Sequence, residues 1–70
     1  MEPYQQRVVD EHNELKERLA KLQAFIESER FSTVQGDEQR LLILQRCHME
    51  SLVEIIGQRI ALFNRAVPVS

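Results

Sequence analysis

The side chains best suited to metal binding or covalent chemistry are few in this sequence: His12, His48 and the single Cys47. A di-iron four-helix bundle needs a glutamate three residues before a histidine on two of its helices. Gln45 stands at that position before His48 and Val9 before His12, so both carboxylates are missing. A zinc site would need more cysteines, or a close pair of histidines. We therefore expect no bound metal and no cofactor.

Nucleophilic catalysis by Cys47 would require a base beside the thiol. His48 follows it directly in the sequence, but successive helical residues point about 100° apart around the axis. The sequence also lacks a glycine-rich phosphate loop and a nucleophile elbow. We expect Cys47 to be a small, half-exposed apolar side chain, and the protein not to be an enzyme.

The spacing of the apolar residues predicts two helices, and these helices position His12, Cys47 and His48. The 70 residues include two Gly and two Pro, a composition typical of helical proteins. We predict an all-α antiparallel two-helix hairpin as a single domain over residues 1–70. Its parts are a helix over residues 3–29, a loop over residues 30–36, a helix over residues 37–65 and a tail over residues 66–70. The first helix carries a narrow seam with spacings of three and four: Val8, His12, Leu15, Leu19, Leu22 and Ile26.

The second predicted helix carries more apolar surface than one neighbour can cover. Eleven large apolar side chains fall within an arc of roughly 180°: Leu41, Leu42, Leu44, Met49, Leu52, Val53, Ile55, Ile56, Ile60, Leu62 and Phe63. A chain this short has a marginal core on its own. We therefore predict a homodimer that forms a four-helix bundle, in which polar residues within the arc set the register. The expected dimer interface comprises Leu44, Gln45, His48, Leu52, Ile55, Ile56 and Arg59.

Charge and hydropathy argue against two classes of partner. The formal net charge is −2, with 9 basic and 11 acidic side chains, which is the wrong sign for gripping phosphate backbones. The longest apolar run, Leu41 to Leu44, is far shorter than the roughly 18 residues of a membrane span. A lone cysteine forms no internal disulfide, and the N-terminal residues lack the features of a signal peptide. We expect a soluble, intracellular protein.

Protein binding remains, and a few exposed apolar or arginine side chains are candidates for it. Aromatic residues and arginines commonly anchor interfaces. Phe31 either closes the open end of the hairpin or forms an apolar tip that touches a partner. Ile43 projects to an otherwise polar side of the second helix. The candidates for partner binding are Tyr4, Phe31, Ile43, Arg46 and Cys47.

One pattern of residues extends over nearly the whole chain: Tyr4-Gln5-Gln6-Arg7-Val8-Val9-Asp10-Glu11, then Glu14-Leu15, Leu22, Phe25-Ile26, Phe31, Glu38-Gln39, Leu41 and Arg59-Ile60-Ala61-Leu62-Phe63. In this pattern the chain resembles a group of small phage accessory proteins that form helical hairpins of similar size and are related to a small protein of crAss-like phages. In size and expected architecture it is also similar to phage anti-quorum-sensing proteins. Those proteins are dimeric hairpins that silence a host quorum-sensing transcription activator and bind a pilus motor ATPase.

This resemblance implies a non-enzymatic protein that binds and inhibits a host protein inside an infected or lysogenic bacterium, most sharply as an anti-activator. It assigns no binding residue. Two alternatives stay open. One is a sponge for cyclic nucleotide immune signals, formed where protomers meet, with Tyr4 stacking on a base and Arg or Lys holding phosphates. The other is an RNA-binding hairpin dimer.

Overall fold

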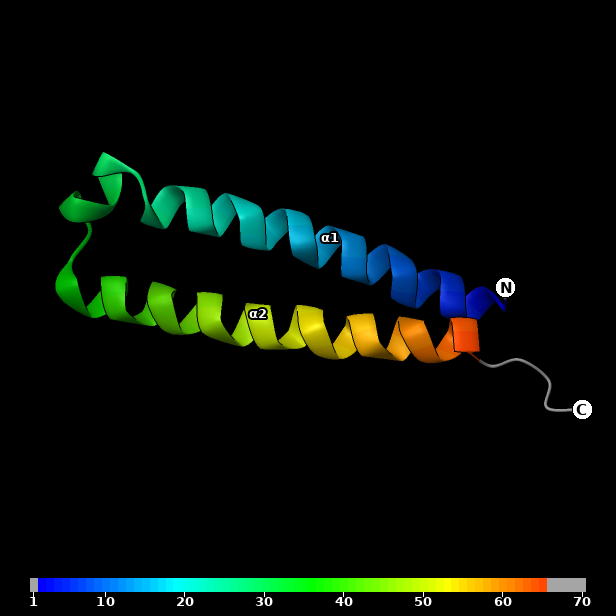
Figure 1. Cartoon of the computed structure of the whole chain (residues 1–70). Coiled ribbons are helices and arrows are strands. Elements are labelled where there is room, and N and C mark those ends of the chain that lie inside the picture. Colours follow the sequence, from blue (N-terminus) through cyan, green and yellow to red (C-terminus); the bar gives the residue numbers. More distant parts are fainter. Residues whose placement is uncertain (1, 66–70) are drawn as a thin grey trace, which may run out of the picture.

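Two long antiparallel helices make up the protein in a computed structural model that describes the backbone of residues 2–65 (Figure 1). Helix α1 spans Pro3–Ile26, a short 3-10 helix η1 spans Glu29–Thr33, and helix α2 spans Gly36–Arg65. No strand occurs in this described part of the chain. The predicted all-α class is confirmed. The predicted tail over residues 66–70 lies outside the described residues.

Helix α1 begins where expected but ends three residues before the predicted end at residue 29. Pro3 occupies the first turn, where its missing N–H costs nothing, and the side chain of Gln5 accepts a hydrogen bond from the backbone N–H of Glu2 at 2.9 Å. At the other end, the Ser28 hydroxyl donates to the carbonyl of Phe25 at 2.6 Å. Serine hydroxyls compete with helical hydrogen bonding in this way, and the chain turns into η1.

The connection between the helices is more ordered than the loop predicted over residues 30–36. Gln39, in the first turns of α2, donates from its Nε2 atom to the carbonyl oxygens of Phe31 and Val34, both at 2.9 Å. The ring of Phe31 packs edge-on against Phe25, with centroids 6.0 Å apart. Phe31 is half-buried, so it closes this end of the hairpin.

Replacing Gln39 with glutamate should loosen this end of the molecule. The carboxylate keeps the shape of the amide but only accepts hydrogen bonds, so it would face two carbonyl oxygens without a proton to donate. We expect the free energy of unfolding, measured by urea denaturation, to fall by roughly 1–3 kcal/mol. The control is Gln58→Glu at an exposed site of α2; an equal loss in both variants would contradict the assigned role.

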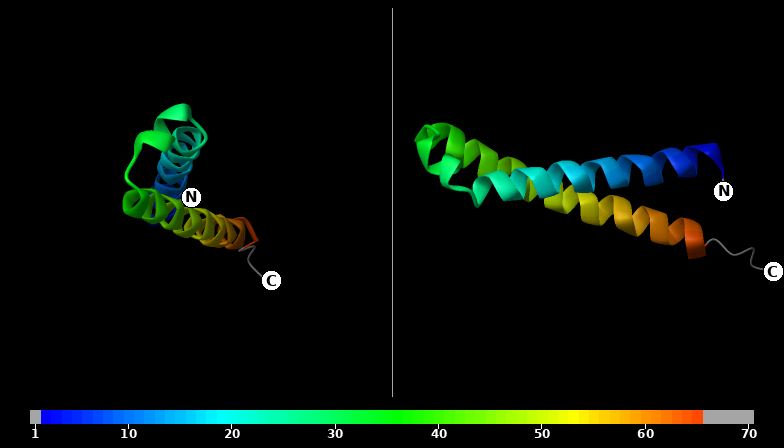
Figure 2. Two further views of the ribbon diagram at one scale, coloured as in Figure 1. Left: turned by 90° about the vertical axis from the view of Figure 1, so that its left-hand side faces the viewer. Right: turned by 90° about the horizontal axis from the view of Figure 1, so that it is seen from above.

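The core is a single layer of side chains between the two helices. Among the described side chains, Val8, Leu19 and Ile56 are buried, with 9%, 9% and 8% of their surface exposed. Half-buried side chains extend this layer along both helices: Leu15, Leu22, Ile26, Leu42, Met49, Val53, Ile60 and Phe63. The helices run antiparallel in one view and cross at an angle in another (Figure 2). Because only three of the described side chains are buried, one hairpin by itself buries little apolar surface.

The end of the hairpin opposite the turn is closed by an aromatic pair. Tyr4 of α1 and Phe63 of α2 meet edge to face, with ring centroids 5.8 Å apart. Such pairs add roughly 0.5–1.5 kcal/mol beyond the area they bury. This contact joins α1 directly to α2, whereas the Phe25–Phe31 pair at the other end joins α1 to η1.

Candidate functional site

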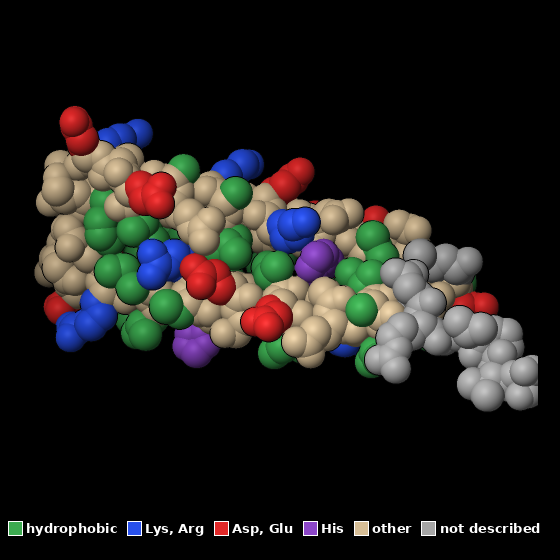
Figure 3. Space-filling view, in the orientation of Figure 1, with side chains coloured by type: hydrophobic (Ala, Val, Ile, Leu, Met, Phe, Trp, Pro, Cys, Tyr) green, Lys and Arg blue, Asp and Glu red, His purple; other side chains and the backbone are tan. Residues whose placement is uncertain are grey.

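An uncovered row of apolar side chains runs along α2, and we call it the α2 stripe. Five of its members are large aliphatic residues with about half or more of their surface exposed: Leu41 (63%), Leu44 (48%), Leu52 (46%), Ile55 (54%) and Leu62 (58%). Two exposed polar residues, His48 and Arg59, complete the row at spacings of three and four. Hydrophobic side chains emerge along the outer edge of α2 as well as between the helices (Figure 3). Soluble monomers rarely leave so continuous an apolar row in water.

The structure divides the predicted dimer interface between two surfaces. Leu44, Gln45, His48, Leu52, Ile55 and Arg59 are all exposed. Ile56 differs, because it is 8% exposed and belongs to the core between the helices. Its neighbour along the chain, Ile55, points about 100° away and stays open. Ile56 therefore serves the fold of one chain, while Leu41 and Leu62, absent from the predicted interface, lengthen the stripe at its two ends.

A groove lies beside the α2 stripe, between the two helices. Its volume is about 200 Å³, and its lining residues are Glu11, Glu14, Leu15, Arg18, Leu52 and Ile56. The floor is aliphatic and the rim carries one guanidinium and two carboxylates. Typical pockets for small molecules measure roughly 300–1,000 Å³, so one chain offers less than a full pocket. Leu52 belongs to both the groove and the stripe, so whatever covers the stripe lies at the mouth of the groove.

Sequence reasoning did not single out Glu14, Leu15 or Arg18 as site residues. A usable signal was present, because Arg18 lies four residues after Glu14 and three after Leu15, the spacings at which helical side chains are neighbours. The pair of Glu14 and Arg18 alone predicts a solvated helix face. Only the placement of Leu52 and Ile56 opposite them makes a groove.

The predicted partner-binding residues do not form one surface. Tyr4 is 51% exposed at one end of the hairpin, while Phe31 is half-buried at the other. Ile43, which is 38% exposed, lies one helical turn before the exposed Cys47, so these two share the outer side of α2. Arg46 lies between them along the chain.

Arg46 is held by its own helix. Its Nε atom lies 3.4 Å from a carboxylate oxygen of Glu50, and the same carboxylate oxygen accepts a hydrogen bond from Gln23 of α1 at 3.3 Å. Partly exposed pairs of this kind contribute little to stability. The contacts do tie the arginine to the α1 side of the helix, away from the α2 stripe.

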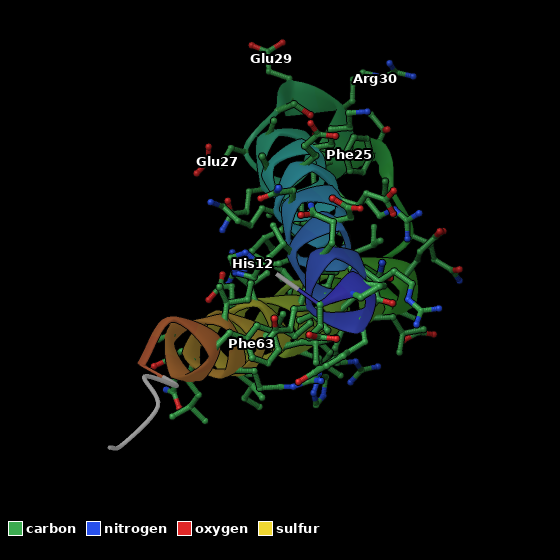
Figure 4. The ribbon with its side chains drawn as sticks, turned by 90° about the vertical axis from the view of Figure 1, so that its right-hand side faces the viewer. His12, Phe25, Glu27, Glu29, Arg30 and Phe63 are labelled. Carbon is green, nitrogen blue, oxygen red and sulfur yellow. The ribbon has the colours of Figure 1, made fainter. Side chains whose placement is uncertain are left out.

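The two histidines lie apart and play different parts. His12 points between the helices, as does Phe63 (Figure 4), and its Nε2 atom donates to the carbonyl oxygen of Val53 at 3.1 Å. A Cβ added to Gly57 would lie 3.4 Å from that nitrogen. This is an ordinary van der Waals separation, so the imidazole ring lies beside Gly57 without requiring a glycine there. His48 is exposed on the α2 stripe.

The described residues contain no group of three or more His, Cys, Asp or Glu side chains that could hold a metal ion. None of the helices in this part of the chain is long and apolar enough to cross a membrane.

Fold and site together define a small all-α hairpin with an uncovered apolar face, a form suited to binding other molecules. Residues 2–62 match the family model described as Sequestin, and the chain belongs to this family. It is also 41% identical over 61 residues to a protein of Enterobacteria phage T4, described as an uncharacterized 7.5 kDa protein in the denB-rIIB intergenic region. That match covers 87% of this chain and 95% of the T4 protein. No solved structure matches the chain. The protein is a small phage accessory protein.

Proposed function

We propose that this protein sequesters a signalling component of the bacterial host, binding it without altering it, in the cytoplasm of an infected or lysogenic cell. The family name supports a protein that sequesters a partner. The α2 stripe and the adjoining groove supply surfaces for a second copy of the chain and for a ligand. In this proposal the working form is a homodimer whose four helices make a bundle.

The groove favours the cyclic nucleotide alternative among the three expected targets. Leu15, Leu52 and Ile56 offer an aliphatic floor against which a base can pack. The guanidinium of Arg18 is suited to a phosphate, which it can hold through two parallel hydrogen bonds. Glu11 accepts hydrogen bonds from amino or hydroxyl groups. The groove is the observation that carries this choice, and two copies of it in a dimer would suit a molecule with two phosphates.

A host protein, such as a quorum-sensing activator or a pilus motor ATPase, is the second candidate. The exposed side of α2 with Ile43 and Cys47 favours it. The predicted aromatic anchors, however, lie at opposite ends of the hairpin and cannot serve a compact interface together. RNA binding has less support, because a long phosphate backbone needs an extended basic surface, whereas the groove offers a single guanidinium and the formal net charge is −2.

Titration calorimetry with a panel of cyclic di- and trinucleotides tests the ligand proposal. We expect heat of binding with at least one of them. In Arg18→Gln the affinity should fall roughly ten- to a hundredfold, because a charge-assisted hydrogen bond is worth about 1.5–3 kcal/mol. Lys21→Gln, on the same helix but outside the groove, should bind like the wild type. Absence of heat with every nucleotide, or equal losses in the two variants, would refute the nucleotide target.

Two further measurements separate the remaining possibilities. Chromatography of the released ligand should return it chemically unchanged, whereas degradation products would mean that the protein is an enzyme. A pull-down from lysate of a bacterial host should recover no defined partner in stoichiometric amount. If it recovers an activator or an ATPase and calorimetry shows no heat, the target is a host protein.

A further inference from the structure

We infer that a second copy of this chain covers the α2 stripe, with the two α2 helices antiparallel and the two-fold axis passing next to Leu52. The exposed area of the chain supports this pairing. The chain exposes 5671 Å², whereas a compact monomer of 8.2 kDa exposes roughly 4,500 Å². The surplus, roughly 1,100 Å², is on the order of the ~800 Å² that each partner contributes to a standard interface.

The spacing within the stripe also fits a partner helix. Its exposed members recur at three and four residues over six turns of α2 (Leu41, Leu44, His48, Leu52, Ile55, Arg59 and Leu62). This is the repeat with which one helix packs along another of similar length. A second α2 is the one such helix that this chain itself supplies, and a two-fold arrangement uses the same face of both copies.

Charge decides the orientation. In a parallel pair, Arg59 would face Arg59 of the second copy, which places like charges across a seam that excludes water. In the antiparallel pair centred next to Leu52, Arg59 faces Leu44 and His48 faces Ile55. The two copies of Arg59 are then roughly 22 Å apart along the seam at 1.5 Å per residue. Every polar member of the stripe meets an aliphatic one, and its polar end can reach water at the edge.

The same arrangement completes the groove. Leu52 lines it and is also the stripe residue nearest the axis, so the α2 helix of the second copy lies along the groove's open side. Each dimer then holds two grooves, one on each side of the axis, each with walls from both copies. The pairing of the two α2 helices does not depend on the proposed ligand, because the second copy covers the stripe whether or not the groove binds a nucleotide.

Cysteine crosslinking in the full-length protein tests orientation and register, in a Cys47→Ser background. Leu52→Cys should form a disulfide-linked dimer upon oxidation, because equivalent residues at the axis come within the short Cα separation that a disulfide requires. Leu62→Cys alone should stay monomeric on a denaturing gel. An equimolar mixture of Leu62→Cys and Leu41→Cys, unfolded and refolded together, should yield crosslinked dimers. Ser51→Cys, beside the axis at an exposed site, serves if Leu52→Cys folds poorly.

Two outcomes would overturn the inference. Self-crosslinking of Leu62→Cys as efficient as that of Leu52→Cys would show a parallel pair. A stable wild-type monomer at micromolar concentration by sedimentation would show that no second copy covers the stripe and would leave that face to a host protein. The test is independent of ligand binding: crosslinking reports the assembly, and calorimetry reports the target.

Discussion

Leu52→Asp is expected to break the dimer and to lower the melting temperature sharply, with much of the helical circular dichroism lost at micromolar concentration. Leu52 is 46% exposed in one chain, so the hairpin alone gives no reason for a large effect. At the proposed axis, two aspartates would be buried side by side, and an unpaired buried charge costs several kcal/mol. The described part of each hairpin has three buried side chains, too small a core to hold the fold unaided.

The matched control for this experiment is Ala61→Asp, which adds the same charge to an exposed site on the outer side of α2. It should remain dimeric and melt close to the wild type. Because folding of the proposed dimer is coupled to association of its two chains, the wild-type melting temperature should also rise with chain concentration. Unchanged sedimentation and melting of Leu52→Asp would mean that α2 pairs with no second copy through this face.

Ile56→Ala is expected to produce the second large effect, through the core of the hairpin. Ile56 is 8% exposed and packs between the helices, so its truncation leaves a cavity that a two-helix core cannot easily close. Such substitutions cost about 2–5 kcal/mol, which is comparable to the whole stability available to a chain of this size. Urea denaturation at a fixed chain concentration should show a midpoint far below that of the wild type, or no cooperative transition.

Ile43→Ala provides the comparison, since it makes the same chemical change where the side chain is 38% exposed and outside the α2 stripe. Its loss of stability should be clearly smaller. If both variants lose the same amount, Ile56 is not the core residue that its burial indicates. Ile43→Ala also tests the alternative target, because a host protein bound at the outer side of α2 would be lost from the pull-down while the fold stays intact.

Local structure was largely predictable because helical periodicity and turn residues are short-range signals. The start of α1 at Pro3 and the reversal of the chain near Gly36 follow from the residues themselves. The end of α1 was predicted three residues too late, since the hydrogen bond from Ser28 to the carbonyl of Phe25 competes with a continuing helix. The two hydrogen bonds from Gln39 to the carbonyl oxygens of Phe31 and Val34 order η1. Helical periodicity does not predict these bonds.

The sequence by itself determined that this protein is a helical hairpin with more apolar surface on α2 than one neighbour can cover. Only the tertiary structure decided how that surface is divided. The apolar arc extends around about half of the helix and contains both Ile55 and Ile56. Periodicity therefore does not predict which of the two side chains is buried. The position of α1, held by the Tyr4–Phe63 contact at one end and by the hydrogen bond from His12 to Val53, buries Ile56 and leaves Ile55 exposed. The same position of α1 also creates the groove beside Leu52, because one wall of the groove comes from α1 and the other from α2.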